Sequence, residues 1–195
     1  YHTSLLVVVL FLGLLGYMIK FTVYDAPKVI TSPYNKRTAA LSEHIRRGNI
    51  KSANDKVLAE TTTNEEGEDV REYPYENMFA HVVGYATHGK AGLESAYNYE
   101  LLSSHTQLVE QLKNGVSGDK NTGDSVITTL DTRLQKAAYY ALEDYQGAIV
   151  AIEPKTGKVR AMVSKPDFDP NTLAADWEAM VSDETNSSLV NRATQ

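Results

Sequence analysis

The N-terminal segment places the strongest constraint on what this chain can fold into. From Thr3 to Ile19 the sequence "TSLLVVVLFLGLLGYMI" carries no charge, and eleven of these residues are Leu, Ile, Val or Phe. A helix of this length spans about 30 Å of hydrocarbon. Lys20 stands near one end, where its ammonium group can reach the membrane interface. We therefore expect residues 1–24 to form an uncleaved, single-pass transmembrane helix.

Two other interpretations of this segment remain open. The apolar run of a cleaved signal peptide is usually shorter and ends in small residues at the cleavage site. Here the candidate site "YDA" begins with Tyr24, which is too large. A helix buried in the core of a globular domain is the second alternative, because apolar periodicity alone does not separate it from a membrane helix.

Composition narrows the classes of partner. The 195 residues suit one or two domains, and 42% hydrophobic with 23% charged residues is ordinary for a folded protein. The net charge of −6 comes without a basic block, so nucleic acid is not an expected partner. The lack of cysteine excludes disulfides, thiol catalysis and cysteine zinc sites. Because the sequence starts with Tyr and ends on "NRATQ" without a helix cap, we expect a fragment cut at both ends.

The stretch "VVGYATHGKAGLE", residues 82–94, has nearly the spacing of a phosphate-binding loop after a possible strand, "MFAHVV". Such a loop needs a Ser or Thr after its lysine to hold magnesium, but position 91 is Ala. The helix that should start at the lysine would also carry Gly92 in its first turn. The stretch is therefore interpreted as a loop and not as a nucleotide site.

The sequence predicts a linker over residues 25–38 and a small mixed α/β module over residues 39–112. Helical spacing and a terminal glycine predict a helix over residues 39–48. Asn54-Asp55 between two extended runs predicts a hairpin turn. After the acidic break "NEEGED", the Tyr, Val and Phe residues of "VREYPYENMFAHVVGY" favour strand.

A Gly- and Asn-rich linker over residues 113–124 precedes a third region, residues 125–195. "SVITTL" predicts a strand, and Asp131 predicts the N-cap of a helix over residues 132–145. The residues at helical spacing predict one apolar face. They are Leu134, Ala137, Ala138, Ala141, Leu142 and Tyr145.

Apolar runs on both sides of "PKTG", residues 154–157, predict a second hairpin. Its first strand is almost wholly apolar, so we expect burial on both faces. Lys-Thr-Gly is also a motif of penicillin-binding proteins and class A β-lactamases, where it accompanies Ser-x-x-Lys. We expect no Ser-x-x-Lys nucleophile in this sequence, and we interpret the motif as a turn with Gly157 in the left-handed position. Three residues after a serine, the chain has Asn35 after Ser32, Asp55 after Ser52 and Asn191 after Ser188.

The order of these segments resembles a known family. "VITTLDTRLQKAAYYAL" followed by "GAIVAIEPKTGKVRAMVSKPDFDPN" is similar to the opening of the transpeptidase domain in high-molecular-weight penicillin-binding proteins. Upstream, "RRGNI", "REYPY" and "GKAGLESAYNYEL" resemble the pedestal, or dimerisation-type, domain of the same family. The residues that carry the resemblance are Arg47, Gly48, Ile50, Arg71, Gly92, Leu93, Glu94, Tyr97, Asp131, Leu134 and Gln135.

The resemblance implies an α+β architecture with a membrane helix, a pedestal over residues 39–112 and a truncated transpeptidase domain. A short anchor with no glycosyltransferase domain before the pedestal is typical of class B, the monofunctional cross-linking type. The chain departs from the family where Ile-x-Asp-Arg-Asn-Gly is usual. It has "IKSAND" at residues 50–55, which puts any pedestal contact of the missing acidic and basic pair in doubt.

The function that the resemblance implies is peptidoglycan D,D-transpeptidation at the outer face of the bacterial cytoplasmic membrane. The family's serine, expected shortly after Gln195, attacks the D-Ala-D-Ala amide of a stem peptide, and β-lactams trap it. The implied partners are stem peptides, β-lactams, the membrane and a membrane glycosyltransferase. No cofactor, metal or catalytic residue is expected in this chain, so the fragment itself should be inactive. The alternative is a non-catalytic, membrane-anchored wall-assembly or β-lactam-sensor protein.

Three further sets of polar residues are candidate sites. His81 and His88 have no third metal ligand at a recognisable spacing, which favours structural roles. Asp167 and Asp169 in "PDFDPN" could act as an acid–base pair, but the flanking prolines favour a turn and the cap of the following helix. Because a lone buried Glu is costly, we expect Glu94 to pair with Arg47 or Arg71 and lock the pedestal elements together.

Overall fold

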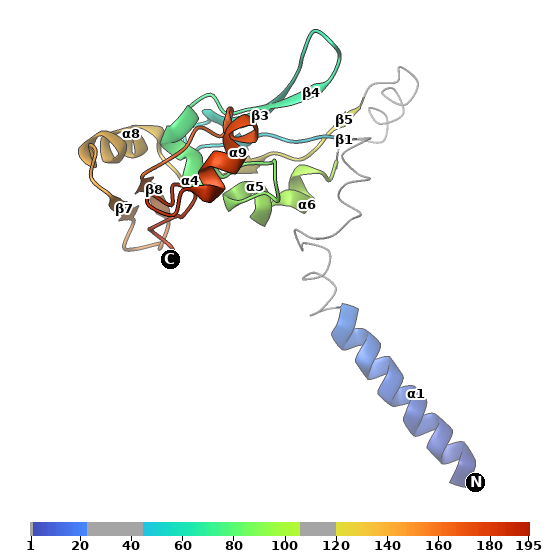
Figure 1. Ribbon diagram of the computed structural model, residues 1–195. Helices are drawn as coiled ribbons and strands as arrows, with labels where there is room; N and C mark the ends of the chain where they lie inside the picture. Colours follow the sequence, from blue (N-terminus) through green and yellow to red (C-terminus); the bar gives the residue numbers. More distant parts are fainter. Residues whose placement is uncertain (1, 23–44, 106–119) are drawn as a thin grey trace.

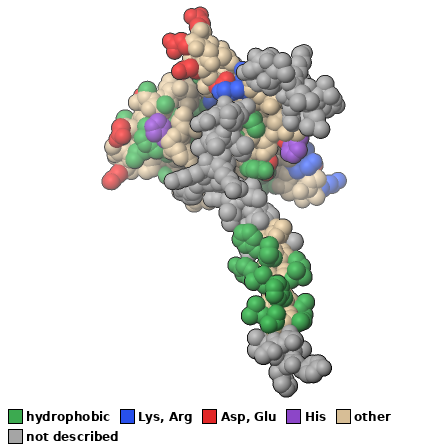
Figure 2. Space-filling model, turned by 90° about the vertical axis from the view of Figure 1, so that its right-hand side faces the viewer, with side chains coloured by type: hydrophobic (Ala, Val, Ile, Leu, Met, Phe, Trp, Pro, Cys, Tyr) green, Lys and Arg blue, Asp and Glu red, His purple; other side chains and the backbone are tan. Residues whose placement is uncertain are grey.

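The computed structural model describes residues 2–22, 45–105 and 120–195, apart from the side chains of residues 2–6. Helix α1 spans His2–Lys20 (Figure 1), where the sequence predicts a helix. Its large apolar side chains from Val7 onward are exposed, and Figure 2 shows them along the visible face of the helix. Within the described residues, no helix meets both the length and the apolarity that crossing a membrane requires. The predicted helix is thus present, while its crossing of a membrane is not shown.

A four-stranded sheet in the order β4-β3-β2-β6 forms the centre of the next region. Its strands are β2 (Ile50–Lys51), β3 (Val57–Thr63), β4 (Asp69–Glu72) and β6 (Val126–Ile127). Strands β2 and β3 are antiparallel, which confirms the hairpin predicted around Asn54-Asp55. Strand β6 lies parallel to β2 and falls inside the predicted strand at residues 125–130.

Strand β1 (Ile45–Arg46) pairs in parallel with β5 (Asn121–Thr122). The predicted helix over residues 39–48 is therefore wrong at its C-terminal end, while residues 39–44 lie outside the described residues. The predicted linker over residues 113–124 is likewise wrong at residues 121–122, and residues 113–119 lie outside the described residues. Both errors have one cause: each strand is stabilised by a partner far away in the sequence, which local patterns do not reveal.

Four short helices follow β4: η2 (Glu76–Phe79), α4 (Ala80–Val83), α5 (Gly92–Ala96) and α6 (Asn98–Leu101). The strand predicted for this region is confirmed in β4 and wrong at residues 76–83. Phe79 and Val83 are 2% and 1% exposed and lie one helical turn apart, so a helix buries both on one side. Burial against the core here overrides the strand preference of these residue types.

Helix α8 (Thr132–Ala141), the hairpin β7 (Gly147–Ile152) and β8 (Val159–Lys165), and α9 (Leu173–Ser182) complete the chain. The Asp131 carboxylate accepts hydrogen bonds from the backbone N–H groups of Arg133 and Leu134, which confirms the predicted N-cap. The helix ends at Ala141, earlier than predicted. Gly157 has φ of +71° in the turn between β7 and β8, as predicted, and α8 packs on both strands (Figure 1).

The burial predicted for β7 is wrong, and the apolar face predicted for α8 is only partly covered. Strand β7 alternates between half-buried and exposed residues, with Val150 and Ile152 exposed. On α8, Leu134 and Ala137 of the apolar face are exposed, whereas Thr132 and Gln135 are buried. Apolar periodicity identifies a face that is suited to burial, but burial itself requires a covering element. The described elements instead pack on the side of α8 that carries Gln135.

The described core consists of two adjoining clusters. The larger contains the pedestal residues Ile50, Leu58, Ala59, Tyr73, Phe79, Val83 and Leu101 together with Leu130. The smaller joins Ala80 to Phe168 and Leu173, with Tyr85 and Trp177 packed against it. Because Phe79 and Ala80 are consecutive residues, the junction of η2 and α4 connects the two clusters.

Candidate functional site

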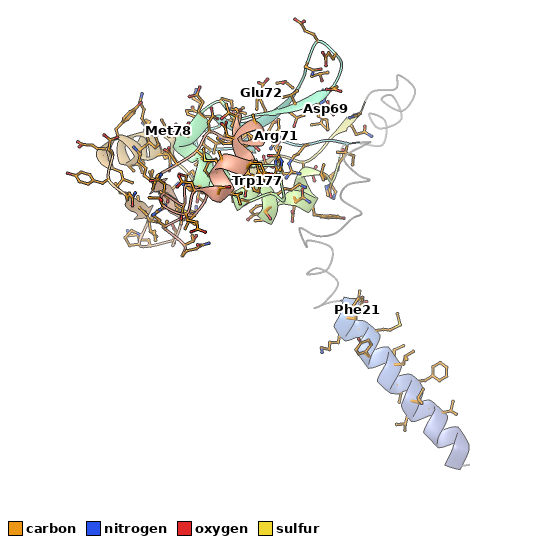
Figure 3. The ribbon with its side chains drawn as sticks, viewed as in Figure 1. Phe21, Asp69, Arg71, Glu72, Met78 and Trp177 are labelled. Atoms are coloured by element: carbon orange, nitrogen blue, oxygen red, sulfur yellow. The ribbon has the colours of Figure 1, made fainter. Side chains whose placement is uncertain are left out.

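Glu94 is the centre of a buried charge cluster. Its side chain on α5 is completely buried, and each carboxylate oxygen has its own arginine. Arg47 Nε donates to Oε2 at 2.6 Å, and Arg71 Nε donates to Oε1 at 2.8 Å. Arg71 projects from β4 (Figure 3). The predicted pairing is thus confirmed, and it involves both arginines instead of one.

The same guanidinium groups bind neighbouring segments. Arg47 donates to the Asn98 side chain at 2.7 Å and to the Glu94 carbonyl at 2.6 Å. Arg71 donates to the Gly48 carbonyl at 2.7 Å. Burial lowers the pKa of Arg47, and the charge of Glu94 opposes that shift. The cluster therefore ties the segment at residues 47–48, strand β4 and helices α5 and α6 into one unit.

Tyr73, the residue directly after β4, also contacts the charge cluster. Its hydroxyl donates to Glu94 Oε1 at 3.4 Å, and its side chain is 5% exposed. Burial raises the pKa of Tyr73, and the adjacent Glu94 charge raises it further. The hydroxyl therefore stays protonated and serves the carboxylate as a third donor.

Three glycines allow backbones to approach closely, and two of them, Gly48 and Gly92, are motif residues. A Cβ at Gly48 would lie 2.0 Å from the Asp124 carbonyl oxygen, and one at Gly123 would lie 1.9 Å from that of Leu101. Gly92 has φ of +57°, and a Cβ there would lie 2.8 Å from the Gly84 nitrogen.

Residues 85–91 form the loop between α4 and α5, as interpreted from the sequence. Because "MFAHVV" is helical, the strand that a phosphate-binding loop needs is absent from this place.

Gln135 joins the last region to the pedestal. Its Nε2 donates to the carbonyls of Met78 and Met162, both at 2.8 Å, and its Oε1 accepts from Met162 N–H at 2.9 Å. The side chain is completely buried. Gln135 thus connects α8 to η2 and β8 at once. The motif residues Ile50 and Leu93 lie in or against the core, while Tyr97 and Leu134 are 41% and 47% exposed.

The turn that departs from the family pattern also contacts α8. Ser52 is buried and donates to the Asn54 side chain at 2.7 Å. Asn54 Nδ2 in turn donates to the Thr132 hydroxyl at 2.8 Å. A polar contact between the β2–β3 turn and the first residue of α8 is therefore present without the usual acidic and basic pair.

Both histidines have structural neighbours. His81 is 8% exposed, and its Nε2 lies 3.0 Å from the Pro166 carbonyl, which can only accept, so Nε2 carries the hydrogen. Burial lowers the pKa of His81, and this hydrogen bond partly opposes the shift. His88 stacks on Trp177 with ring centroids 4.7 Å apart. In the described part of the chain, no group of three His, Cys, Asp or Glu residues could hold a metal ion.

The two aspartates of "PDFDPN" have separate roles. Asp169 Oδ1 accepts from the N–H and the side-chain amide of Asn171, which confirms the predicted turn. The predicted helix cap is wrong, because Thr172 is the N-cap of α9 and makes no side-chain capping bond. Asp167 accepts from Asn77 Nδ2 at 3.1 Å. The carboxylates therefore order local chain segments and contact the pedestal.

One Ser-x-x-Lys spacing was missed in the sequence. Ser117 stands three residues before Lys120, so the expectation that the sequence lacks this spacing is wrong. Ser117 lies outside the described residues, and Lys120 Nζ donates to Asp69 Oδ2 at 2.7 Å. A lysine that activates a serine must direct its amine to the hydroxyl, whereas this amine is bound to a carboxylate of β4. We assign the spacing no catalytic role.

A cavity of about 370 Å³ lies where the pedestal and the C-terminal residues meet. The pedestal contributes α4 and the loop before α5, and the other wall contains Met162, Phe168 and the C-terminal run. Asn191 Nδ2 donates to the His81 carbonyl at 3.4 Å across this junction. The residues from the C-terminal run are Leu189, Asn191, Thr194 and Gln195.

Two known domain families match successive stretches of this chain. Residues 47–126 match the penicillin binding protein A dimerisation domain, and residues 147–195 match the penicillin binding protein transpeptidase domain. We call the first stretch the dimerisation region and the second the transpeptidase region. Both matches occur in the order that the sequence motifs indicate.

Individual relatives agree with these matches. The peptidoglycan D,D-transpeptidase PbpA of Mycolicibacterium smegmatis is 33% identical over 98% of this chain and 42% of its own length. The peptidoglycan D,D-transpeptidase MrdA of Escherichia coli is 31% identical over 64% of this chain and 25% of its own length. The chain thus spans less than half the length of these curated relatives.

A solved structure shows the same fold. The imipenem acyl-enzyme complex of penicillin-binding protein A from Mycobacterium tuberculosis has a TM-score of 0.66 and 31% identity, covering 77% of this chain and 38% of that one. With two domains of one family matched in order, and a buried charge cluster and glutamine junction built from the motif residues, the chain belongs to the penicillin-binding proteins.

Proposed function

We propose that the protein to which this sequence belongs is a serine-type peptidoglycan D,D-transpeptidase of bacterial cell-wall synthesis. The observation that supports this most is the ordered match to a dimerisation and a transpeptidase domain. The relatives PbpA and MrdA carry that activity in their names. The acyl-enzyme complex with imipenem, from a protein 31% identical to this chain, supports β-lactams as ligands of the same kind of site.

In this proposal a serine attacks the D-Ala-D-Ala amide of a stem peptide and releases D-alanine, leaving an acyl-enzyme. The amine of a second stem peptide then takes the acyl group and frees the serine. A β-lactam forms an acyl-enzyme at the same serine as its ring opens. No residue of this chain is assigned to the chemistry. Its contribution is structural, because the Glu94 cluster and Gln135 hold the transpeptidase region on a rigid support.

Covalent labelling tests the proposal directly. The full-length protein, incubated with a fluorescent β-lactam and then denatured, should retain the label, and excess unlabelled penicillin G should prevent it. Protein that takes up the label should also release D-alanine from a pentapeptide substrate. A folded full-length protein that takes up no label would contradict the proposal and favour a non-catalytic wall-assembly protein.

We further propose that residues 1–24 anchor the protein in the bacterial cytoplasmic membrane and that a membrane glycosyltransferase supplies the glycan strands. The uncharged run from Thr3 to Ile19 and the exposed apolar side chains of α1 support the anchor. Full-length protein should sediment with membranes and resist high-salt extraction, whereas a variant lacking residues 1–24 should not. Equal sedimentation of both would contradict the anchor without affecting the proposed reaction.

A further inference from the structure

The Asp169-Pro170-Asn171 segment connects the two regions through a two-point contact. Asn171 Oδ1 accepts from the Tyr73 N–H at 2.9 Å, and Asn171 Nδ2 donates to the Tyr73 carbonyl at 3.1 Å. Tyr73 follows directly after β4. One side-chain carboxamide thus pairs with both backbone groups of a residue, as the backbone of a neighbouring strand would.

Asp169 fixes the orientation of this carboxamide. Its Oδ1 accepts from Asn171 Nδ2 at 2.9 Å and from the Asn171 N–H at 2.8 Å. A carboxylate can only accept, so the amide nitrogen must face Asp169. The amide oxygen is thereby left for the Tyr73 N–H. We call this arrangement of Asp169, Asn171 and the Tyr73 backbone the carboxamide latch.

The latch holds the start of the segment that forms the cavity wall. Asn171 lies two residues before α9, whose Leu173 is 1% exposed against Ala80 and Phe168. Further along α9, Trp177, labelled in Figure 3, stacks on His88 of the pedestal loop. Beyond α9, residues 189–195 return to α4 and line the cavity.

Other carboxamides act at the same junction, and Gln135 makes the same kind of two-point pairing with the backbone of Met162. Asn77 contacts Asp167, and Asn191 contacts the His81 carbonyl at the longer distance of 3.4 Å. Gln135 fixes α8 and β8, whereas α9 is not among its partners. Among the described residues, the latch is therefore a short, two-point hydrogen-bonded contact between the segment before α9 and the end of β4.

We propose that Asn171, oriented by Asp169, is a positioning residue for acyl transfer. This inference rests on the proposed function, and Asn171 itself contacts no reacting atom in it. The latch sets where α9 and the run at residues 189–195 stand relative to the dimerisation region. Because a displacement of about 1 Å in a reacting group can cost about a hundredfold in rate, a loosened latch should slow acylation more than it weakens ligand binding.

The test uses the full-length protein and the variants Asn171→Ala and Asp169→Ala. The acylation rate constant and the dissociation constant of the preceding non-covalent complex are measured with a fluorescent β-lactam, well below each melting temperature. Asn171→Ala should lower the rate constant about tenfold or more and leave the dissociation constant within about threefold. Asp169→Ala should lower the rate constant less, since both bonds between Asn171 and Tyr73 can still form.

Two controls separate positioning from general destabilisation. Asn186→Ala removes a carboxamide that, in the described part of the chain, binds Asp183 of its own loop, and it should acylate at the wild-type rate. Tyr73→Phe removes the hydroxyl bond to Glu94 but keeps the backbone groups that Asn171 binds. It should lower the melting temperature with little change in the acylation rate constant.

Several outcomes would overturn the inference. The first is an acylation rate constant of Asn171→Ala equal to that of the wild type. The second is an equal fall of the acylation rate constant in Asn171→Ala and Tyr73→Phe at matched stability. The third is an Asn171→Ala protein in which binding weakens, so that the dissociation constant changes, while the acylation rate constant does not. If Asn171→Ala does not fold, a wild-type rate in Asp169→Ala overturns it instead. Failure of the wild-type protein to acylate would refute the proposed function itself, and that experiment needs no variant.

Discussion

The dimerisation region and the transpeptidase region differ in which side chains they bury. In the dimerisation region a charged side chain is buried, because Glu94 lies fully buried between Arg47 and Arg71. The second leaves apolar side chains such as Ile152 of β7 more than half exposed. In the first region, β5 and β6 return from later in the sequence to pair with β1 and β2. We therefore expect the stability of the dimerisation region to depend strongly on the Glu94 cluster and on these strand pairings.

Ion pairs show the same difference. The Arg160–Glu153 pair of the transpeptidase region has side chains 33% and 36% exposed. Water can solvate both charges if that pair is broken, whereas the buried Glu94 cluster has no such access. Loss of stability should therefore follow the burial of the partner that remains and not the number of ion pairs removed.

Replacement of Glu94 should produce the largest effect. Glu94→Ala leaves two guanidinium groups buried without a counter-charge, and the free energy of unfolding should fall by about 3–5 kcal/mol. Glu153→Ala is the matched control and should leave the unfolding midpoint nearly unchanged. Urea denaturation of the full-length proteins measures both. Similar losses in the two variants would remove the distinction between the regions.

The close backbone crossing gives the next prediction. In Gly123→Ala the new Cβ would lie 1.9 Å from the Leu101 carbonyl oxygen, and the chains must separate at a cost of about 3 kcal/mol. Gly67→Ala has open space around it, although its φ of +82° makes alanine unfavourable by about 1 kcal/mol. Thermal unfolding compares the two. A Gly123→Ala protein as stable as Gly67→Ala would show that the crossing can relax.

Gln135 tests the connection between the regions. Gln135→Ala leaves backbone groups of Met78 and Met162 without their partner, which should cost about 2 kcal/mol. Lys136→Ala, on the exposed neighbouring position of α8, serves as the control. Hydrogen exchange should show faster opening of β8 in Gln135→Ala than in the control. Unchanged protection of β8 would contradict the role of Gln135 as a connector.

The smallest effect concerns pH. Burial holds the pKa of His81 below the ordinary 6.5, so the unfolded chain takes up a proton first as the pH falls. The stability contributed by neutral His81 is complete above about pH 6.5 and is lost as the pH falls through the folded-state pKa. Asp167 and Arg192 act on the group in opposite directions. Unfolding at several pH values should show this slope in wild type and His88→Gln, and a weaker one in His81→Gln.

The sequence predicted the features that depend on local chemistry. The Asp131 cap, the turn at Asn54-Asp55 and the left-handed Gly157 follow from residue types a few positions apart. The pairing of Glu94 with the arginines followed from the cost of burying a lone carboxylate. Resemblance to a family identified Gln135 as a motif residue, but its contacts with Met78 and Met162 were known only from the structure.

Features that depend on distant partners could not be predicted in this way. The pairing of β1 with β5 joins segments that carry no strand signal of their own. The helices at residues 76–83 form where strand propensity is high, because Phe79 and Val83 must reach the same core. The latch of Asn171 was missed because Asp169 was interpreted as a helix cap. A carboxamide that mimics a strand leaves no periodic signal in the sequence.

The pairing of β1 and β2 with the later strands β5 and β6 also has a consequence for synthesis of the protein. Strands β1 and β2 leave the ribosome long before β5 and β6, and each gains its parallel partner only when those later strands emerge. Until then, the edge of β2 lacks its neighbour and is open to unintended pairing. A pause in translation while residues 121–127 are still inside the ribosome should therefore favour aggregation of the nascent chain, whereas a pause after they have emerged should leave the sheet protected.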